Sequence, residues 1–129
     1  MDLTENRTNN PNLITSAQPD QCVIGSQKHK KTIIIPSDGQ VIEYSIESIN
    51  ELTKELIAQL CDYQPEVIIL ATGQHIEFPE TNILDQLVSK NIGLEVLNNQ
   101  AAARTFNVLL AESRKTVCLM IIKDCCISH

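Results

Sequence analysis

The chain has few aromatic residues: it contains no tryptophan, and phenylalanine and tyrosine make up 3% of its 129 residues. A row of aromatic rings that could stack on the bases of single-stranded nucleic acid is therefore absent. Basic residues are also scarce, because ten lysines and arginines stand against sixteen aspartates and glutamates, for a formal net charge of -6. This balance opposes attraction to nucleic-acid phosphates, and we expect no nucleic-acid partner.

Long apolar runs are missing as well. The longest, 67–71 and 117–122, are too short to cross a bilayer. The first twenty residues are polar, contain Arg7 as their single basic residue, and resemble neither a secretion signal nor a transit peptide. Five cysteines, an odd number without a disulfide framework, fit reduced thiols. These features predict a cytoplasmic protein with no membrane insertion.

The length fits one domain. Residues 1–20 contain too few large apolar side chains to offset the entropy of ordering, so we expect a flexible N-terminal tail there, a single α/β domain over 21–124 and a short C-terminal tail over 125–129. Cys125 and Cys126 lie in that last tail. Adjacent cysteines point apart and no second ligand pair has a suitable spacing, so neither a metal nor another cofactor is expected. The role of the two thiols stays open.

Apolar periodicity divides the folded part in two. Short apolar runs at 22–24, 32–35 and 41–45, separated by glycine and proline, predict an antiparallel meander. From residue 48 onwards helical stripes alternate with apolar strands, which predicts βαβ crossovers because a helix must cross back before the next parallel strand can pair. Helices are expected over 48–60, 79–91 and 100–114, and strands over 67–71, 92–97 and 116–122. The expected fold is α/β: a mixed sheet with an antiparallel N-terminal meander and βαβ crossovers, in a three-layer sandwich.

Polar residues follow two of the expected parallel strands and begin the last helix. Ligands of such sheets bind where the loops leave the carboxyl ends of the strands. An arginine beside amides and hydroxyls at a positive helix end suits a carboxylate, a phosphate or the carbonyls of a partner. The predicted crevice comprises Thr72, Gly73, Gln74, His75, Asn98, Asn99, Arg104, Thr105 and Asn107. In the alternative interpretation, Asn98 or Asn99 caps the helix and Arg104 pairs with Glu112, Glu77 or a carbonyl group.

Groups for catalysis are few. A nucleophile needs an oriented base, and the expected domain offers only His29 and His75. His75 is the single candidate acid or base, with a solvated loop histidine as the alternative. A phosphate-binding glycine loop is absent, and the basic run at 28–31 is interpreted as the solvated start of a strand, with a phosphate patch as the alternative. No catalytic residue is assigned, and the sequence does not predict an enzyme.

Three segments together resemble one known family: Ala71-Thr72-Gly73 at the end of an apolar strand, the run 93–97, and residues 101–109 followed by Glu112 and Arg114. They are similar to a small α/β domain of unknown function that includes assembly factor three of mitochondrial respiratory complex I and an adipogenesis-associated relative. The resemblance implies a mixed-sheet domain that works by binding and brings no established catalytic residues.

We therefore expect a non-enzymatic protein-interaction or assembly factor with a protein partner. One alternative stays open, a small-molecule protein that binds an anionic ligand, or an enzyme, in the crevice around His75 and Arg104. A homodimer formed through an edge of the front strands also stays open.

Overall fold

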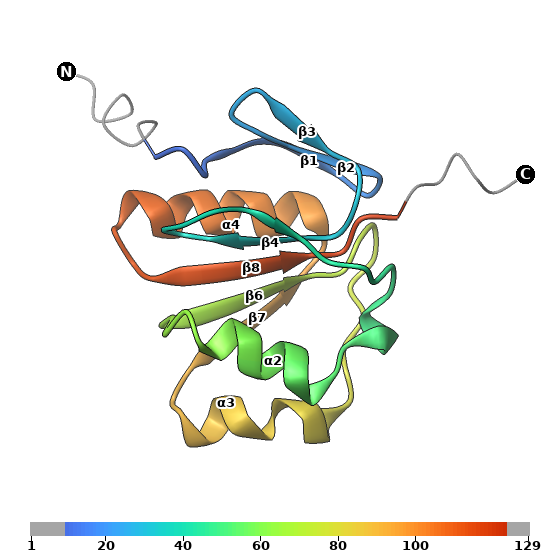
Figure 1. Cartoon of the computed structure of the whole chain (residues 1–129), viewed down its shortest axis with the longest axis vertical. Coiled ribbons are helices and arrows are strands. Elements are labelled where there is room, and N and C mark those ends of the chain that lie inside the picture. The colour runs from blue at the N-terminus through green and yellow to red at the C-terminus, as the bar shows by residue number, and fades with distance from the viewer. Residues whose placement is uncertain (1–9, 124–129) are drawn as a thin grey trace, which may run out of the picture.

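The computed structural model describes residues 10–123, which form two sheets and the helices that pack on them (Figure 1). The elements are β1 (Ile14–Gln18), β2 (Gln21–Ile24), β3 (Gln27–His29), β4 (Ile33–Pro36), β5 (Ile42–Glu43), η1 (Ile49–Glu51), α2 (Lys54–Cys61), β6 (Val67–Ala71), η2 (Thr81–Leu84), α3 (Asp85–Ser89), β7 (Gly93–Leu97), α4 (Asn99–Ala111) and β8 (Thr116–Met120). One sheet has the order β1-β2-β3 and the other the order β5-β4-β8-β6-β7.

The five-stranded sheet is mixed, as predicted. Its β6 pairs in parallel with both β7 and β8, while β4 pairs with β8 and with β5 in the antiparallel sense. The connection from β6 to β7 contains α3, and the connection from β7 to β8 contains α4. Helix α4 and the small sheet lie on one side of the large sheet, and α2 and α3 lie on the other (Figure 1). The predicted α/β class, βαβ crossovers and three layers are confirmed.

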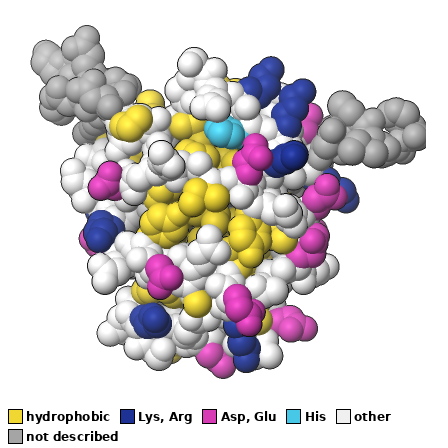
Figure 2. Space-filling model, in the orientation of Figure 1, with side chains coloured by type: hydrophobic (Ala, Val, Ile, Leu, Met, Phe, Trp, Pro, Cys, Tyr) yellow, Lys and Arg dark blue, Asp and Glu magenta, His cyan; other side chains and the backbone are white. Residues whose placement is uncertain are grey.

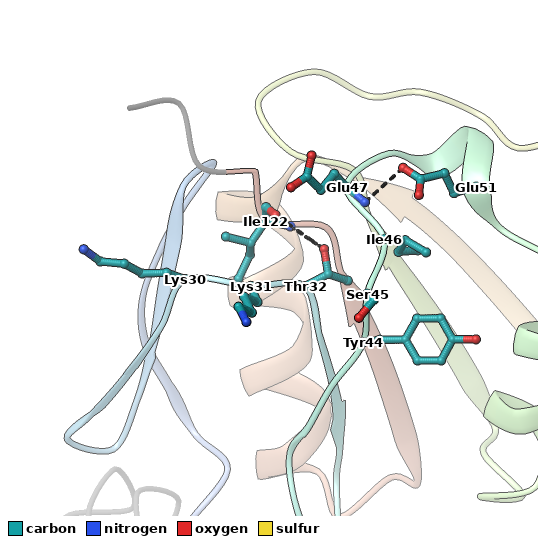
Figure 3. A pocket seen from close by; sticks show the side chains of 9 residues that line it. All are labelled: Lys30, Lys31, Thr32, Tyr44, Ser45, Ile46, Glu47, Glu51 and Ile122. Carbon is teal, nitrogen blue, oxygen red and sulfur yellow. Dashed lines mark hydrogen bonds between the residues drawn. The ribbon is translucent and has the colours of Figure 1, made fainter. Parts of the chain in front are cut away.

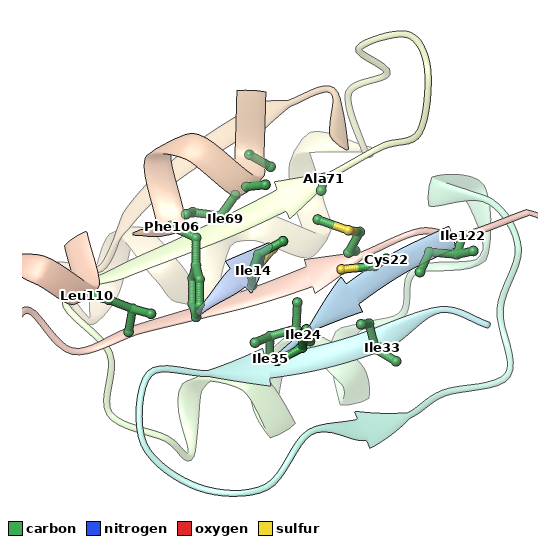
Figure 4. Packing of buried hydrophobic residues seen from close by; sticks show 14 of the residues in the cluster. Ile14, Cys22, Ile24, Ile33, Ile35, Ile69, Ala71, Phe106, Leu110 and Ile122 are labelled. Carbon is green, nitrogen blue, oxygen red and sulfur yellow. The ribbon is translucent and has the colours of Figure 1, made fainter. Parts of the chain in front are cut away.

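Two apolar layers hold these elements together, because successive side chains of a strand point to opposite faces of a sheet. Residues 67–71 are apolar at every position, so β6 supplies both layers: Ile69 faces α4 and the small sheet, and Ile68 faces α2 and α3. Figure 4 shows the first layer, in which Phe106 of α4 and Cys22 of β2 meet the isoleucines of β4. A central strand covered on both faces positions the loops that leave its carboxyl end.

The front of the chain differs from the expectation in two ways. The run 22–24 pairs with β1 and β3 in a sheet of its own, whereas β4 and β5 form an edge of the large sheet. A flexible tail up to residue 20 is wrong for residues 10–20, because β1 spans Ile14–Gln18 and pairs with β2. Ile14 is buried against α4, and this tertiary packing orders a segment that is too polar to order alone. Residues 1–9 and 124–129 lie outside the described part.

Two helix boundaries also differ. The stripe expected over 48–60 breaks at residues 52 and 53, because Ser48 caps the short η1 and the Thr53 hydroxyl begins α2 by accepting a hydrogen bond from the amide of Leu56. The helix expected over 79–91 is divided into η2 and α3, which ends at Ser89, and Asn91 then takes the left-handed conformation with φ of 57°. Within residues 10–123, the structure has no helix that is long and apolar enough to cross a membrane.

Candidate functional site

The carboxyl ends of β6 and β7 meet at one end of the large sheet, where the crevice was predicted. The amide of Asn99 donates to the carbonyl oxygen of Gly73 over 2.9 Å, and the amide of Gly73 donates to Asn99 Oδ1 over 2.8 Å. Helix α4 therefore begins directly beside the turn that follows β6. The structure brings Thr72, Gly73, Asn98 and Asn99 together, as the sheet topology requires.

The side chain of Asn99 lies between the turn after β6 and the ends of β1 and β8. Its exposed fraction is 1%, and its Nδ2 donates to the carbonyl oxygens of Gln18 over 3.2 Å and of Ile121 over 2.9 Å. One amide group thus joins the ends of β1 and β8 to the turn after β6 at Gly73. The Oδ1 atom accepts one hydrogen bond and the Nδ2 group donates two, all inside the protein. Asn99 therefore supports the structure and does not face a ligand.

Thr72 organises the loop that leaves β6. Its hydroxyl donates to the carbonyl oxygen of His75 over 2.6 Å and accepts from the amide of Glu77 over 3.1 Å. Gly73 has φ of 99°, a left-handed conformation that other residues rarely adopt. The loop is consequently held at its base by a buried hydroxyl and a glycine turn, although its residues 74–78 are exposed.

Two more predicted site residues have structural partners. Asn98 is the N-cap of α4, and its Oδ1 accepts from the amide of Ala101 over 2.9 Å, which is the alternative role that the sequence left open. The amide group of Asn107 accepts from the N–H of Ile14 over 2.9 Å and donates to the carbonyl oxygen of the same residue over 2.8 Å. Asn107 therefore pairs with β1 much as a neighbouring strand would.

The remaining predicted residues are available to solvent. Arg104, Gln74 and His75 are exposed and Thr105 is half-buried. Within residues 10–123, Arg104 forms no ion pair with either carboxylate considered for it; the ion pair that does form joins Arg114 Nε to Glu66 Oε1 over 3.1 Å. The guanidinium of Arg104 is therefore open to a partner.

Two apolar residues of the same loop were missed by the sequence reasoning. Ile76 is 49% exposed and Phe78 is 74% exposed, although both are large and apolar. The sequence signal was present: both lie between Gly73 and Pro79, in a stretch that matches neither a helical stripe nor a strand. Phe78 is one of only two phenylalanines in the chain, and the other, Phe106, is fully buried. An exposed aromatic side chain on a supported loop is typical of a recognition surface.

A hollow of about 480 Å³ lies at the same end of the sheet, on the β4 side of β8. It is lined by Lys30, Lys31, Thr32, Tyr44, Ser45, Ile46, Glu47, Glu51 and Ile122. Figure 3 shows that Lys30 and Tyr44 point in opposite directions, while the Glu51 carboxylate accepts a hydrogen bond from the amide of Glu47. The charged groups do not converge on one point, and none of the predicted crevice residues lines this hollow.

Thiol and metal chemistry find no support in the described residues. Burial raises the pKa of Cys22 to about 12 and raises the pKa of Cys118 as well, so both thiols stay protonated and unreactive at neutral pH. No three side chains of histidine, cysteine, aspartate or glutamate between residues 10 and 123 are placed to hold a metal ion. Cys125 and Cys126 lie outside the described residues.

Known proteins resemble the chain over most of its length. A protein of Francisella tularensis subsp. holarctica, named 13 kDa major membrane protein, is 28% identical over 100 residues, which cover 76% of this chain and 79% of that protein. The NADH dehydrogenase (ubiquinone) 1 alpha subcomplex assembly factor 3 of Xenopus tropicalis is 26% identical over 83 residues, 63% of this chain and 45% of that factor. The chain thus spans about half the length of the assembly factor.

A solved structure agrees with the fold. The solution structure of a Xanthomonas campestris protein is 31% identical and superimposes with a TM-score of 0.78, covering 84% of this chain and 83% of that one. The family model described as protein of unknown function (DUF498/DUF598) matches residues 14–121, from the first residue of β1 to one residue beyond the end of β8. The resemblance predicted from the sequence is confirmed, and the chain belongs to this family.

Proposed function

We propose that the chain is a non-enzymatic assembly factor that binds another protein through the loop after β6. The observation that carries this proposal is the exposure of Ile76 and Phe78 on a loop whose base is fixed by Thr72. A loop that is tied at its base loses less entropy on binding than an unrestrained loop, and a large aromatic side chain buries much apolar area against a partner. Both properties favour protein recognition.

The predicted crevice residues divide into two groups in this proposal. Thr72, Asn98, Asn99 and Asn107 hold the frame, since each has hydrogen-bond partners inside the protein. The exposed Gln74, His75 and Arg104, with the half-buried Thr105, form the polar part of the binding surface. Arg104 would hold a carboxylate or carbonyl groups of the partner. This surface takes a protein chain better than a small molecule, because Gln74, His75 and Arg104 are exposed and none of them lines the hollow at this end of the sheet.

The names of relatives support the assembly role. The Xenopus tropicalis relative is named for the assembly of NADH dehydrogenase, and its match to this chain includes less than half of its own length. We extend this role to the chain: in cells that contain the chain and NADH:ubiquinone oxidoreductase, the chain assists the assembly of that enzyme. Its surface loop contacts a subunit or a second assembly factor during that process.

The test deletes the gene in such cells and then restores it as the wild type, as the double variant Ile76→Ser/Phe78→Ser, or as Val88→Ser. Val88 is a matched control, because it is apolar and 79% exposed but lies on α3. The assembled oxidoreductase is measured on native gels, and the bound proteins are quantified after cross-linking and purification. We expect deletion and the double variant to lower the amount of assembled enzyme together, and the control to behave as wild type.

The outcomes test the assembly role and the binding surface separately. An unchanged amount of assembled oxidoreductase after deletion would show that the assembly role is wrong. Full complementation by the double variant would show that the loop is not the binding surface. Circular dichroism of the purified variants confirms that they fold, which we expect because both substituted side chains are exposed.

A further inference from the structure

The small and the large sheet have four outer strands between them, β1, β3, β5 and β7, and these strands differ in how their edges are protected. The outer edge of β1 is covered, since Asn107 pairs with Ile14. β3 has three residues and β5 has two, and short edge strands offer little to a further strand. β7 has five residues, as many as the central β6, and pairs only with β6 among the described residues. It is the long edge that remains open.

The outward-facing backbone groups of β7 belong to Leu94 and Val96. The amide of Gly93 donates to Glu66 and the carbonyl of Leu97 accepts from Thr72, so the odd-numbered residues point their backbone groups towards β6. Backbone direction alternates along a strand, and Leu94 and Val96 therefore point away from it. Within residues 10–123 no hydrogen bond occupies these outward groups.

The side chains of β7 specify what can lie beside it. Leu94 and Val96 face the α2 and α3 side and are half-buried in that apolar layer. Glu95 lies on the opposite face, in register with Ile69, and is exposed. No ion pair to Glu95 is formed by the described residues. A strand added here would continue the apolar row on one face and would meet a single unpaired carboxylate on the other.

This carboxylate disfavours a second copy of the chain in the register that pairs Glu95 with Glu95. An antiparallel pair of β7 strands related by a twofold axis at Glu95 would place the two Glu95 side chains directly opposite each other. That position is a non-hydrogen-bonded pair, in which facing side chains are closest. Like charges directly opposite one another destabilise a strand pair, whereas opposite charges stabilise it. Charge complementarity therefore favours a strand with a basic residue at this position, and the net charge of -6 favours the same partner.

We propose that β7 binds an extended segment of a partner protein as an added antiparallel strand, with a lysine or arginine of that segment opposite Glu95. Apolar residues on either side of the basic residue lie against Leu94 and Val96. Main-chain hydrogen bonds supply the affinity, and the apolar row and the Glu95 carboxylate supply the specificity. The inference rests on the proposed function in one respect, that the partner is a protein, and it names the chemistry of the segment that binds.

The test uses the full chain and two synthetic peptides. In the first, valine alternates with threonine and a single central arginine replaces one threonine; in the second, glutamate replaces the arginine. NMR titration gives the Kd of each peptide and the exchange rates of the Leu94 and Val96 amides. We expect the arginine peptide to slow exchange at both amides and to bind roughly five- to tenfold more tightly than the glutamate peptide.

Four variants of the protein test the result further. Glu95→Lys should reverse the preference between the two peptides, whereas Glu112→Lys makes the same charge change at the exposed end of α4 and should leave the preference unchanged. Val96→Pro removes one outward amide and should weaken both peptides; if this variant does not fold, the reversal by Glu95→Lys decides alone. The variant Ile76→Ser/Phe78→Ser should bind the peptides as wild type does, which separates this edge from the loop of the proposed function.

The proposal is overturned if neither peptide slows exchange at Leu94 and Val96, or if Glu95→Lys leaves the preference unchanged. Protection of the same two amides in the free protein, together with the mass of a dimer, would identify a second copy of the chain as the occupant and would also overturn it. The proposal is supported if Glu95→Lys reverses the preference between the two peptides and Glu112→Lys does not.

Discussion

At the scale of single residues, asparagine side chains make the hydrogen bonds that connect chain segments at the end of the sheet where the crevice was predicted. Asn98 caps α4, and Asn99 beside it joins Gly73, Gln18 and Ile121 through one buried amide group. A buried amide that loses its partners leaves donors and acceptors unsatisfied, which costs more than the bonds contribute when formed. The polar residues that suggested a ligand site are therefore needed to connect three chain segments.

Asn99→Ala should lower the free energy of unfolding by about 2–3 kcal/mol, because the amide of Gly73 and two carbonyl groups lose a buried partner. Asn98→Ala removes only the helix cap and should cost about 1 kcal/mol. Gln100→Ala, an exposed position in the same turn, serves as the control. Urea denaturation measures all three, and equal costs at positions 98 and 99 would contradict the bridging role of Asn99.

At the scale of elements, β1 depends on α4 more than on its own sequence. The strand has one buried side chain, Ile14, and its remaining side chains are exposed or half-buried. Asn107 supplies both a donor and an acceptor to Ile14, so a helix side chain replaces the neighbouring strand that this edge lacks. Local propensity could not indicate this order, because the pairing residues are 93 positions apart.

Asn107→Ala should loosen β1 without unfolding the rest. We expect the amide of Ile14 to exchange at least about tenfold faster, because its acceptor on α4 is gone, and amides of β6 to keep their protection. Arg104→Ala is the control on the same helix, since Arg104 is exposed and makes no such contact. Hydrogen exchange followed by NMR measures both, and an equal loss of protection in β1 and β6 would argue against local opening.

At the scale of the whole molecule, two apolar layers on the faces of one sheet determine stability, and buried thiols are part of them. Cys22 of β2 and Cys118 of β8 lie in the layer that joins the small sheet to the large one, and Figure 4 shows Cys22 there. Figure 2 shows one face of the molecule, on which apolar side chains gather where β4, β8 and α2 lie, with charged side chains around them. Burial of the thiols has a measurable consequence at high pH.

Stability should fall as the pH rises above about 8.5, where an unfolded thiol loses its proton. The folded-state pKa of Cys22 is about 12, and that of Cys118 is raised too, so the folded protein keeps protons that the unfolded chain has released. Each buried thiol then contributes a loss of about 1.4 kcal/mol per pH unit. Well below pH 8.5 the thiols are protonated in both the folded and the unfolded state, so they cause no loss of stability there.

Urea denaturation at a series of pH values, from neutral pH to well above the pKa of a free thiol, measures this dependence of stability on pH. The double variant Cys22→Ala/Cys118→Ala is less stable at neutral pH because it leaves cavities, but its stability should fall less steeply with pH. All other side chains are the same in the two proteins, so their contributions to the pH dependence cancel in the comparison. Parallel curves for wild type and variant would mean that the two thiols do not titrate on unfolding.

Much of the architecture could be predicted, because it depends on short-range periodicity. The uninterrupted apolar run of β6 predicted a strand covered on both faces, and the stripe of Ala102, Phe106, Leu109 and Leu110 predicted α4. The helix expected over 79–91 begins as η2 and ends at Ser89, and Asn91, one of the few residue types that tolerate it, takes the left-handed conformation that follows. Periodicity identified the elements better than their ends.

The sequence by itself determined the α/β class, the parallel centre of the large sheet and the family, because each depends on apolar spacing or on a contiguous motif. Only the tertiary structure decided that the asparagines of α4 bind the chain's own backbone and that Ile76 and Phe78 stay outside the core. The physical reason is that a polar side chain has the same chemistry for a ligand and for a buried carbonyl, and its partner is chosen by segments far away in the chain.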